Sequence, residues 1–352
     1  MRRKWSKQSA LHFDMNVEQE LLDLYRDLNN HTYTTSPSIA FVVMHPKPRE
    51  VFAANFRDRI VHHWIALKLA PIMEECLIPN TFSCMPRRGT DAMQKEARRI
   101  FENNAEMWYL KLDISGFFNS IDKAILWNKI KTLIYNQYLD QSDKEELLWL
   151  VEETIMHDVS KDCILHCPKS LWDSIPANRT LFNNKTKGMA IGNLVSQMYA
   201  NYYLNDIDHY CYTKYRVYLR YVDDMMLVDT RENLRKAIPI IRAMLSAIGL
   251  KLNEKKVQLQ PICRGVDVVG KVIKGKRMYT RERTKKAALR KLPTLPFEKK
   301  NLCYINSYLG FFKSSTNFKA RKEIALSLDK SWTRKGHFDT EYTRFTFNRY
   351  TR

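Results

Sequence analysis

The 352-residue sequence predicts an α+β fold in which a sheet carries paired acidic residues and a basic helical region follows it. Three observations lead to this prediction. Two apolar stretches, 215–222 and 225–229, are joined across adjacent carboxylates, the pattern of a β-hairpin. Strand-like and helix-like segments alternate through the middle of the chain. A hydrophobic fraction of 45% with 12% aromatic residues is typical of a folded protein with a large core.

The first part of the chain contains patterns typical of both helices and strands. Residues 1–36 look like a helical segment, and the apolar, β-branched residues 39–44 predict a strand. A second short apolar stretch follows at 51–52. Apolar residues at helical spacing between 60 and 69 then predict a helix.

The centre of the chain alternates between the two kinds of element, with one interruption. Residues 158–187 carry Pro, Asn, Lys and Ser without periodicity and predict a loop-rich insertion. The helix at 231–248 is well marked by apolar residues at four- and three-residue spacing and by the stop at Gly249. After 281 the sequence indicates basic helices. The other predicted elements are strand 107–114 and helices 122–135, 143–157 and 193–210.

Positive charge is concentrated at the C-terminal end. The whole chain carries a net charge of +20 and has a pI near 9.6. Residues 251–352 hold 26 lysines and arginines against 8 acidic residues, whereas residues 1–250 are nearly neutral at +2. Basic regions of this size bind polyanions with release of counterions, so we expect a nucleic-acid partner. A solvated basic surface without a partner is the alternative.

The seven cysteines are odd in number and irregularly spaced, which indicates free thiols in a reducing compartment. Cys163, His166 and Cys167 lie near His157, so a zinc site is one interpretation. Their spacing differs from the usual CxxC and no second pair follows, so scattered core or loop residues are favoured. The start at Met1 lacks the apolar stretch of a signal peptide, and we expect a cytoplasmic protein without a membrane span.

Two acidic positions follow strand-like runs. Asp113 ends the run 108–113, and Asp223 and Asp224 join the two strands of the expected hairpin. Adjacent carboxylates beside apolar strands repel each other and lose hydration, a cost that a bound cation removes. With the Asp113 strand alongside, the three carboxylates could hold two Mg²⁺ ions, with Mn²⁺ as a substitute, about 3.5–4 Å apart for phosphoryl transfer. Asp223-Asp224 alone would indicate an ordinary acidic turn.

These residues resemble a known family. Tyr221-Val222-Asp223-Asp224 matches the YxDD signature of reverse transcriptases. The resemblance extends in the same order across residues 37–280, with a thumb beyond. The other similar blocks are 47–61 and 82–92 (fingers of the bacterial, intron-related branch), 187–197 (nucleotide pocket), 249–256 (palm) and 268–270 (primer-grip hairpin).

The resemblance implies a nucleotidyltransferase with the right-hand polymerase fold, in which an antiparallel palm sheet carries the YVDD hairpin. It also implies a division of the chain into four regions. These are a helical extension at 1–36, fingers at 37–106 with part of 158–200, a palm at 107–280 and a basic helical thumb at 281–352.

Catalytic roles follow from the same resemblance. Asp113, Asp223 and Asp224 are implied as the catalytic metal ligands, with Ile114 as a further ligand position. One ion would activate the primer 3′-hydroxyl and the other would neutralise the triphosphate. Lys256 is a candidate general acid for the departing pyrophosphate, and a solvated lysine is the alternative.

Four further positions resemble nucleotide-binding residues. Lys47 and Arg49 resemble the cations that grip the incoming triphosphate, although a basic surface turn would look the same for Lys47. Phe118 matches the steric gate, whose ring clashes with a 2′-hydroxyl, and a core aromatic is the alternative. Gly192 lacks a Cβ and lets the backbone approach the nucleotide.

The chain departs from most reverse transcriptases at two places. Most have Gln-Gly where this chain has Ile191-Gly192, and Ser-Pro where it has Ser196-Gln197. The pattern is similar to the reverse transcriptases of diversity-generating retroelements, as are residues 306–310 and 318–321. Both Ile191 and Gln197 would face the nucleotide, and an aliphatic Ile191 lacks the hydrogen bonds of a Gln amide, so it should hold the nucleotide less tightly.

This resemblance implies error-prone synthesis of cDNA on a template-repeat RNA, with errors at adenines, for mutagenic retrohoming. The implied partners are the template RNA, the primer and cDNA, dNTPs and a small accessory protein. Another bacterial reverse transcriptase, of the retron, intron-like or phage-defence type, is the first alternative. A non-catalytic RNA-binding scaffold is the second, although a scaffold has no need for three clustered carboxylates.

Overall fold

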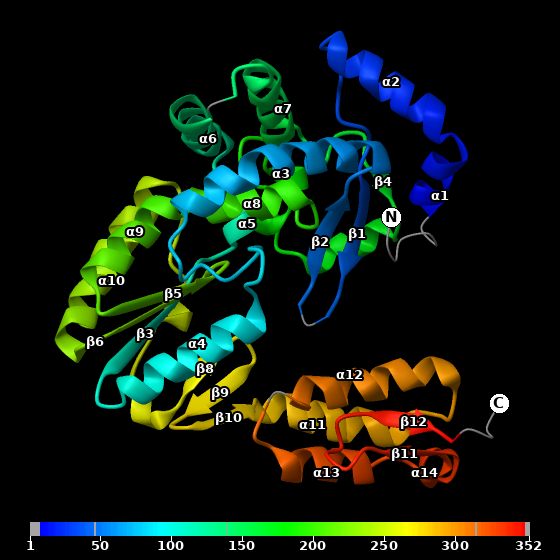
Figure 1. The fold of residues 1–352 in the computed structure, drawn as a ribbon, viewed down its shortest axis with the longest axis vertical. Helices are drawn as coiled ribbons and strands as arrows, with labels where there is room; N and C mark the ends of the chain where they lie inside the picture. Colours follow the sequence, from blue (N-terminus) through cyan, green and yellow to red (C-terminus); the bar gives the residue numbers. More distant parts are fainter. Residues whose placement is uncertain (1–7, 46, 139, 314, 349–352) are drawn as a thin grey trace. The chain divides into compact units, whose positions relative to one another are not determined.

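The computed structural model describes residues 8–45, 47–138, 140–313 and 315–348, which form helices and four sheets in an α+β arrangement (Figure 1). This agrees with the predicted fold class. The chain divides into two compact units. The first unit is formed by Met1–Pro86, Lys111–Met225 and Lys236–Val257, and the second by Arg87–Leu110, Met226–Arg235 and Gln258–Arg352.

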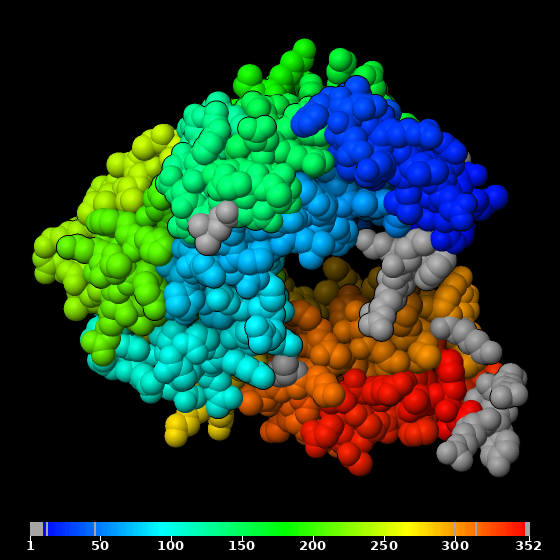
Figure 2. Space-filling model, turned by 45° about the horizontal axis from the view of Figure 1, so that its top comes forward, coloured from blue at the N-terminus to red at the C-terminus, as the bar shows by residue number. Residues whose placement is uncertain are grey.

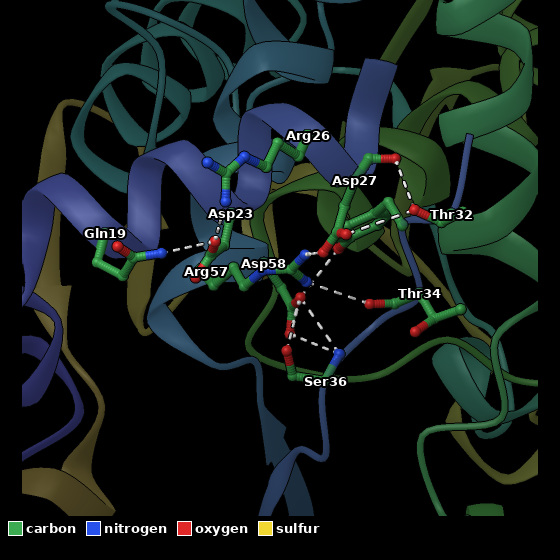
Figure 3. A network of polar contacts seen from close by, with 10 residues as sticks. Gln19, Asp23, Arg26, Asp27, Thr32, Thr34, Ser36, Arg57 and Asp58 are labelled. Atoms are coloured by element: carbon green, nitrogen blue, oxygen red, sulfur yellow. Dashed lines mark hydrogen bonds and ion pairs between the residues drawn. The ribbon is translucent and has the colours of Figure 1, made fainter. Parts of the chain in front are cut away.

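The first unit begins with two helices, α1 (Gln8–Met15) and α2 (Val17–Asn29), as expected for the N-terminal segment, of which residues 1–7 lie outside the described part. Polar contacts fasten α2 to helix α3 (Phe56–Cys76), as Figure 3 shows. The Arg57 guanidinium donates a hydrogen bond to the Asp27 carboxylate on α2. In Figure 2 these N-terminal residues, coloured blue, lie at the surface of the molecule.

Asp58, the next residue of α3, is completely buried and ties down the segment that leads away from α2. Its carboxylate accepts a hydrogen bond from the Tyr33 hydroxyl at 2.9 Å. It also accepts one from the Ser36 backbone N–H at 3.2 Å (Figure 3). Burial raises the pKa of Asp58, and these hydrogen bonds act in the opposite direction. Helix α2 and the segment that follows it are therefore held to α3 by specific polar contacts.

A three-stranded sheet follows, with strand order β2-β1-β4. Strand β1 (Ile39–Val43) pairs antiparallel with β2 (Arg49–Ala53) and parallel with the two-residue β4 (Ile164–Leu165). The expected loop-rich insertion at 158–187 thus contributes one short strand. The rest of it contains three 3₁₀ turns: η1 (Lys169–Ser174), η2 (Ala177–Arg179) and η3 (Leu181–Asn183).

Glu50 fastens the insertion to this sheet. Its side chain is 4% exposed and accepts hydrogen bonds from Trp172 Nε1 at 3.2 Å, Thr180 Oγ1 at 2.8 Å and the Leu181 backbone N–H at 2.6 Å. Burial raises the pKa of Glu50, and the three donors lower it. One buried carboxylate therefore collects three donors from the insertion.

Four more helices of the first unit lie further along the chain. They are α6 (Lys123–Gln137), α7 (Lys144–Met156), α8 (Leu194–Tyr203) and α9 (Asn205–Lys214). The single helix expected at 193–210 is wrong, because the chain breaks at Leu204, where ψ is 1°. Leu204 is itself buried, and the change of direction lets α9 bury Ile207 and Asp208. Figure 1 shows α8 alongside α3.

A four-stranded sheet has the strand order β5-β6-β3-β7. Its strands are β3 (Trp108–Asp113), β5 (Val217–Tyr221), β6 (Asp224–Asp229) and β7 (Gln258–Pro261). Helix α10 (Arg231–Ala247) follows β6 and buries Leu234, Ile241 and Leu245, as its apolar spacing predicts. Gly249 comes after it with φ +75°, a left-handed conformation that suits glycine at a helix end.

The second unit contains a three-stranded antiparallel sheet and a set of short helices. The sheet has the order β10-β9-β8. The elements are α4 (Thr90–Asn103), η5 (Ile262–Arg264), β8 (Val266–Val268), β9 (Lys271–Lys274), β10 (Arg277–Thr280), α11 (Glu282–Lys291), η6 (Leu292–Thr294), η7 (Lys299–Asn301), α12 (Leu302–Lys313), α13 (Phe318–Leu326), α14 (Lys330–Lys335), β11 (Gly336–Phe338) and β12 (Phe345–Phe347).

The end of this unit corrects the expectation of an entirely helical region after 281. Strands β11 and β12 pair antiparallel and cover a core formed by α11–α14. Phe345 is fully buried against Trp332, with ring centroids 5.8 Å apart. Gly336 makes this possible, because a Cβ there would lie 2.3 Å from Phe345 Cζ. A strand of three residues is too short to produce a recognisable alternation of apolar and polar residues in the sequence.

No helix among the described residues is both long and apolar enough to span a bilayer.

Candidate active site

Asp113 is the last residue of β3. The strand buries Leu110 and Leu112 completely, and Asp113 itself is 6% exposed. Its Oδ1 accepts a hydrogen bond from Asn253 Nδ2 at 2.9 Å, and its Oδ2 accepts one from Lys256 Nζ at 2.5 Å. Both partners belong to one short stretch that includes the 3₁₀ turn η4 (Glu254–Lys256). The structure thus brings the predicted residues Asp113 and Lys256 into direct contact.

Asp223 and Asp224 lie where β5 gives way to β6. Strand β5 ends at Tyr221, β6 begins at Asp224, and the two strands are neighbours in the sheet. Val222 and Asp223 form the turn between them, and Val222 has the left-handed φ of +55°. Lys111 Nζ lies 3.7 Å from Asp224 Oδ1.

The charges of Asp113 and Asp224 act on Asp223. The pKa of Asp223 is raised to about 6, first by burial and then by the negative charges of Asp224 and Asp113, while Lys256 lowers it. Lysines neutralise Asp113 and Asp224 at contact distance. In the part of the chain that the structure describes, no three His, Cys, Asp or Glu side chains are grouped closely enough to enclose a metal ion as they stand.

Ile114, the other expected ligand position, follows directly and is 1% exposed. It forms an isolated antiparallel bridge with Leu252, and the Ser115 N–H donates to the Lys251 carbonyl oxygen at 2.8 Å. The backbone after Asp113 is therefore paired with the segment that leads to Lys256. This pairing fixes the two residues relative to each other.

Phe118 lies in α5 (Phe117–Ser120), the single turn that follows Asp113. Its ring is half-buried, and its centroid is 5.5 Å from that of Phe117. The Met189 N–H donates to the Phe118 carbonyl oxygen at 2.8 Å, and the Gly188 N–H donates to that of Ile121 at 2.7 Å. The expected steric-gate residue and the expected nucleotide-pocket block therefore run side by side.

Ile191 and Gly192 form the turn before α8. Gly192 has φ +117°, and a Cβ there would lie 3.2 Å from Val51 Cγ1 on β2. The neighbouring Asn193 accepts a hydrogen bond through Oδ1 from the Ala54 N–H at 3.3 Å. The turn is therefore tied to the strand that begins at Arg49, and Ile191 is half-buried within it.

The remaining nucleotide-binding candidates occupy two other places. Arg49, exposed, is the first residue of β2, and Lys47, also exposed, lies in the connection from β1. Gln197, on α8, accepts a hydrogen bond through Oε1 from Cys84 Sγ at 3.1 Å. That bond joins the 187–197 block to the 82–92 block.

Three residues of the site escaped the sequence interpretation. Asn253 and Lys111 contact the carboxylates directly. Lys111 lies two residues before Asp113, so strand alternation could have placed both on one face of β3. Arg220, buried beneath the Val222-Asp223 turn, had no local signal.

The structure gives the cysteines ordinary surroundings. Cys167 Sγ accepts a hydrogen bond from the Val42 N–H at 3.3 Å, and Cys163 packs with Trp172 against the small core around Phe52. All seven cysteines are free thiols, and the described residues contain no metal-binding group around them. These contacts favour the scattered core and loop interpretation over zinc.

Comparison with known proteins adds the family. A family model described as "Reverse transcriptase (RNA-dependent DNA polymerase)" matches residues 45–273. No curated protein matches the sequence. Among solved structures, the chain is similar to telomerase from Candida albicans in complex with a fragment of telomeric RNA, with a TM-score of 0.51, 13% identity and coverage of 84% of this chain and 55% of that one.

Apo telomerase from Candida tropicalis is similar to the same degree, with a TM-score of 0.52, 10% identity and coverage of 83% of this chain and 56% of that one. The chain therefore spans little more than half the length of either telomerase. At such low identity the likeness is one of fold.

Proposed function

Because this chain belongs to the reverse-transcriptase family, we propose that it synthesises DNA on an RNA template with Asp113, Asp223 and Asp224 as its catalytic carboxylates. One observation carries the proposal. Asp113, from the end of β3, lies close enough to Asp223 for their charges to interact, although they are 110 positions apart in sequence. Folding has therefore gathered like charges, a cost that Lys111 and Lys256 offset here and that a bound divalent cation would remove.

The donor set fits Mg²⁺, with Mn²⁺ as a substitute. Carboxylate and backbone oxygens are the ligands that such hard cations prefer, and Asp113, Asp223, Asp224 and the Ile114 position supply them. Bound divalent ions would lower the pKa of the primer 3′-hydroxyl and neutralise charge on the triphosphate. Lys256 must release Asp113 Oδ2 before that oxygen can serve as a ligand, because its ammonium lies 2.5 Å away.

The released Lys256 then has a second role in the proposal. Its side chain is 51% exposed and can turn toward the β- and γ-phosphates, where an ammonium is able to protonate the departing pyrophosphate. Lys47 and Arg49 would contact the same phosphates from the β1–β2 connection. Each of these cations stabilises the charge that builds up as the bond to the α-phosphate breaks.

The sugar and base would lie where α5 and the residue after it are hydrogen-bonded to the 187–192 block. Phe118 is proposed as the steric gate against a 2′-hydroxyl, supported by the Met189 hydrogen bond that fixes its backbone. Gly192 is proposed as the position at which the backbone comes close to the nucleotide. Gln197 is proposed to line the pocket from α8, with its amide oriented by Cys84.

The regions of a right-hand polymerase are assigned in the same proposal. Fingers would span 37–106 with part of 158–200, the palm 107–280 with an antiparallel sheet and the YVDD hairpin, and the thumb 281–352, preceded by the helical extension at 1–36. Support comes from the neighbouring strands β5 and β6, which meet at Val222-Asp223.

The finer proposal is mutagenic retrohoming, in which the enzyme copies a template-repeat RNA with errors at adenines. Its proposed partners in this reaction are a primer and a small accessory protein. Its support is Ile191, which stands in the turn beside Gly192 and offers contact without hydrogen bonds. A template repeat and a variable repeat beside the coding region would support this type. Their absence would favour a retron, intron-like or phage-defence enzyme.

The decisive test is primer extension on an RNA template with Mg²⁺, comparing the parent with Asp223→Asn. We expect the variant to lose extension while keeping its fold and RNA affinity, because the amide removes a ligand charge. Asp173→Asn, which changes an exposed carboxylate of the insertion, is the matched control and should extend normally. Extension by Asp223→Asn at the parental rate would refute the metal assignment. An inactive parent that still binds RNA would favour the non-catalytic scaffold.

A further inference from the structure

Arg220, on β5, is a charged residue in an unusual place. Its side chain is 0% exposed, a rare state for arginine unless every donor is paired. It precedes the Tyr-Val-Asp-Asp sequence directly. The backbone on both sides of it is fixed as well: its N–H donates to the Asn80 carbonyl oxygen, and its own carbonyl oxygen accepts from the Phe82 N–H, each at 3.0 Å.

One edge of the guanidinium is neutralised by Asp208, which is also 0% exposed and comes from α9. Nε donates to Oδ1 at 2.8 Å, and Nη2 donates to Oδ2 at 2.6 Å, so the pair is bidentate. The Tyr218 hydroxyl donates to Asp208 Oδ1 at 2.8 Å. Asp208 therefore neutralises the guanidinium through two of its N–H groups, and the remaining N–H groups of Arg220 can donate to other acceptors.

Those donors reach the turn that presents the catalytic carboxylates. Nη1 donates to the Val222 carbonyl oxygen at 3.1 Å and to Asn201 Oδ1 at 3.1 Å, and Nη2 donates to the Asn201 carbonyl oxygen at 3.0 Å. All five N–H groups of the guanidinium thus have acceptors. The contact with Val222 is the one that links the buried ion pair to the turn.

Val222 needs such a contact. Its φ of +55° lies in the left-handed region, where a β-branched side chain is strained, and such conformations persist only when their surroundings impose them. The peptide after Val222 leads directly into Asp223, so a change at Val222 moves that carboxylate. A fixed Val222 carbonyl therefore determines where Asp223 points.

We propose that Arg220 is a positioning residue that holds the Val222-Asp223 turn in its strained form, so that Asp223 faces Asp113 and can share a metal ion with it. The inference rests on the proposed function of these carboxylates. Arg220 contacts neither substrate nor metal. It acts through one carbonyl oxygen, braced by Asp208 and Asn201.

The test separates this role from general stability. Arg220→Lys keeps a cation beside Asp208, but a single ammonium cannot span Asp208, Asn201 and Val222 as the guanidinium does. Tyr218→Phe is the matched control, because it removes one hydrogen bond from the same buried cluster and leaves Val222 untouched. Three measurements compare the proteins: thermal unfolding, Mn²⁺ binding without nucleic acid, and the Mg²⁺ dependence of primer extension. Mn²⁺ binding is measured from the electron paramagnetic resonance signal of free Mn²⁺.

We expect Arg220→Lys to weaken Mn²⁺ binding and to raise the Mg²⁺ requirement by roughly ten- to a hundredfold, the usual effect of losing an outer partner of a metal site. Tyr218→Phe should bind Mn²⁺ as the parent does. Equal Mn²⁺ affinity in the parent and both variants would overturn the positioning role, as would equal losses in both variants.

Two further proteins complete the experiment. If Arg220→Lys does not fold, the pair Arg220→Met with Asp208→Leu removes both buried charges together, a change that folded proteins tolerate well. It should fold and still lose Mn²⁺ affinity, and parental affinity would overturn the role. Asp223→Asn tests the underlying site: if it binds Mn²⁺ as the parent does, the metal site itself fails, and the inference fails with it.

Discussion

Lys271, on β9 next to the proposed primer-grip residues 268–270, should make the stability of the second unit depend on pH. Its side chain is 2% exposed, and Nζ donates to Thr280 Oγ1 at 3.0 Å and to the Phe311 carbonyl oxygen. Nζ also lies 4.4 Å from the centroid of the Phe311 ring. Burial lowers the pKa of Lys271 from 10.5 to about 8, and Asp91 on α4 acts weakly in the opposite direction.

The sign follows from which state holds the proton. Between pH 8 and 10.5 the folded protein has released the Lys271 proton, while the unfolded chain still binds it. The free energy of unfolding therefore rises with pH across this window. The two pKa values give a gain of about 1.5 kcal/mol by pH 9 and about 3 kcal/mol above both pKa values.

Urea denaturation of the parent and Lys271→Met at pH 7, 8 and 9 measures this gain. Subtracting the variant from the parent cancels every other titrating group, so the difference should shift toward the parent by about 1.5 kcal/mol between pH 7 and pH 9. Lys274→Met, on the same strand but exposed, is the control and should show no such shift. A difference that stays constant from pH 7 to pH 9 would refute the reasoning.

Three other predictions concern the proposed polymerase. Phe118→Val should admit ribonucleotides in primer extension, because the clash with the 2′-hydroxyl disappears. Unchanged selectivity between ribonucleotides and deoxyribonucleotides in an active variant would support the alternative, that Phe118 is a core aromatic residue. The parent should misincorporate nucleotides frequently opposite template adenines, and Ile191→Gln should be more accurate. Sequencing of cDNA made by both proteins on one RNA template compares their error rates. An equal, low error rate at all four template bases in the parent would contradict the retroelement type. RNA affinity should fall steeply with salt because residues 251–352 carry +18, and a logarithmic slope of about one or less would contradict a basic clamp.

Elements with a strong local pattern were predictable from the sequence. The apolar spacing of α10 and the run that ends at Asp113 depend on neighbouring residues alone, and both elements form within one or two residues of the expected bounds. The break at Leu204 depends instead on where α8 and α9 find their partners. A continuous helical pattern in the sequence does not carry that information, since tertiary packing overrides local propensity.

The same distinction holds within the candidate site. Asp223 and Asp224 were identifiable because the two strands and the acidic pair are contiguous in sequence. The contact of Lys256 with Asp113 joins residues 143 positions apart, and no local pattern encodes it. Arg220 looked like an ordinary polar residue at the end of a strand, and only folding shows that α9 supplies Asp208 beneath it.

Glu50, which collects three donors from the insertion at 158–187, has a consequence for how this region can change during evolution. Two of the three donors, Trp172 Nε1 and Thr180 Oγ1, are side-chain groups, so they survive only particular substitutions. The Leu181 N–H is a backbone group that nearly any residue offers. Homologues that retain an acidic residue at position 50 should therefore retain donors at 172 and 180, whereas the intervening loop is free to diverge. Homologues with an apolar residue at 50 should lose those donors together, because an unpaired partner would remain buried.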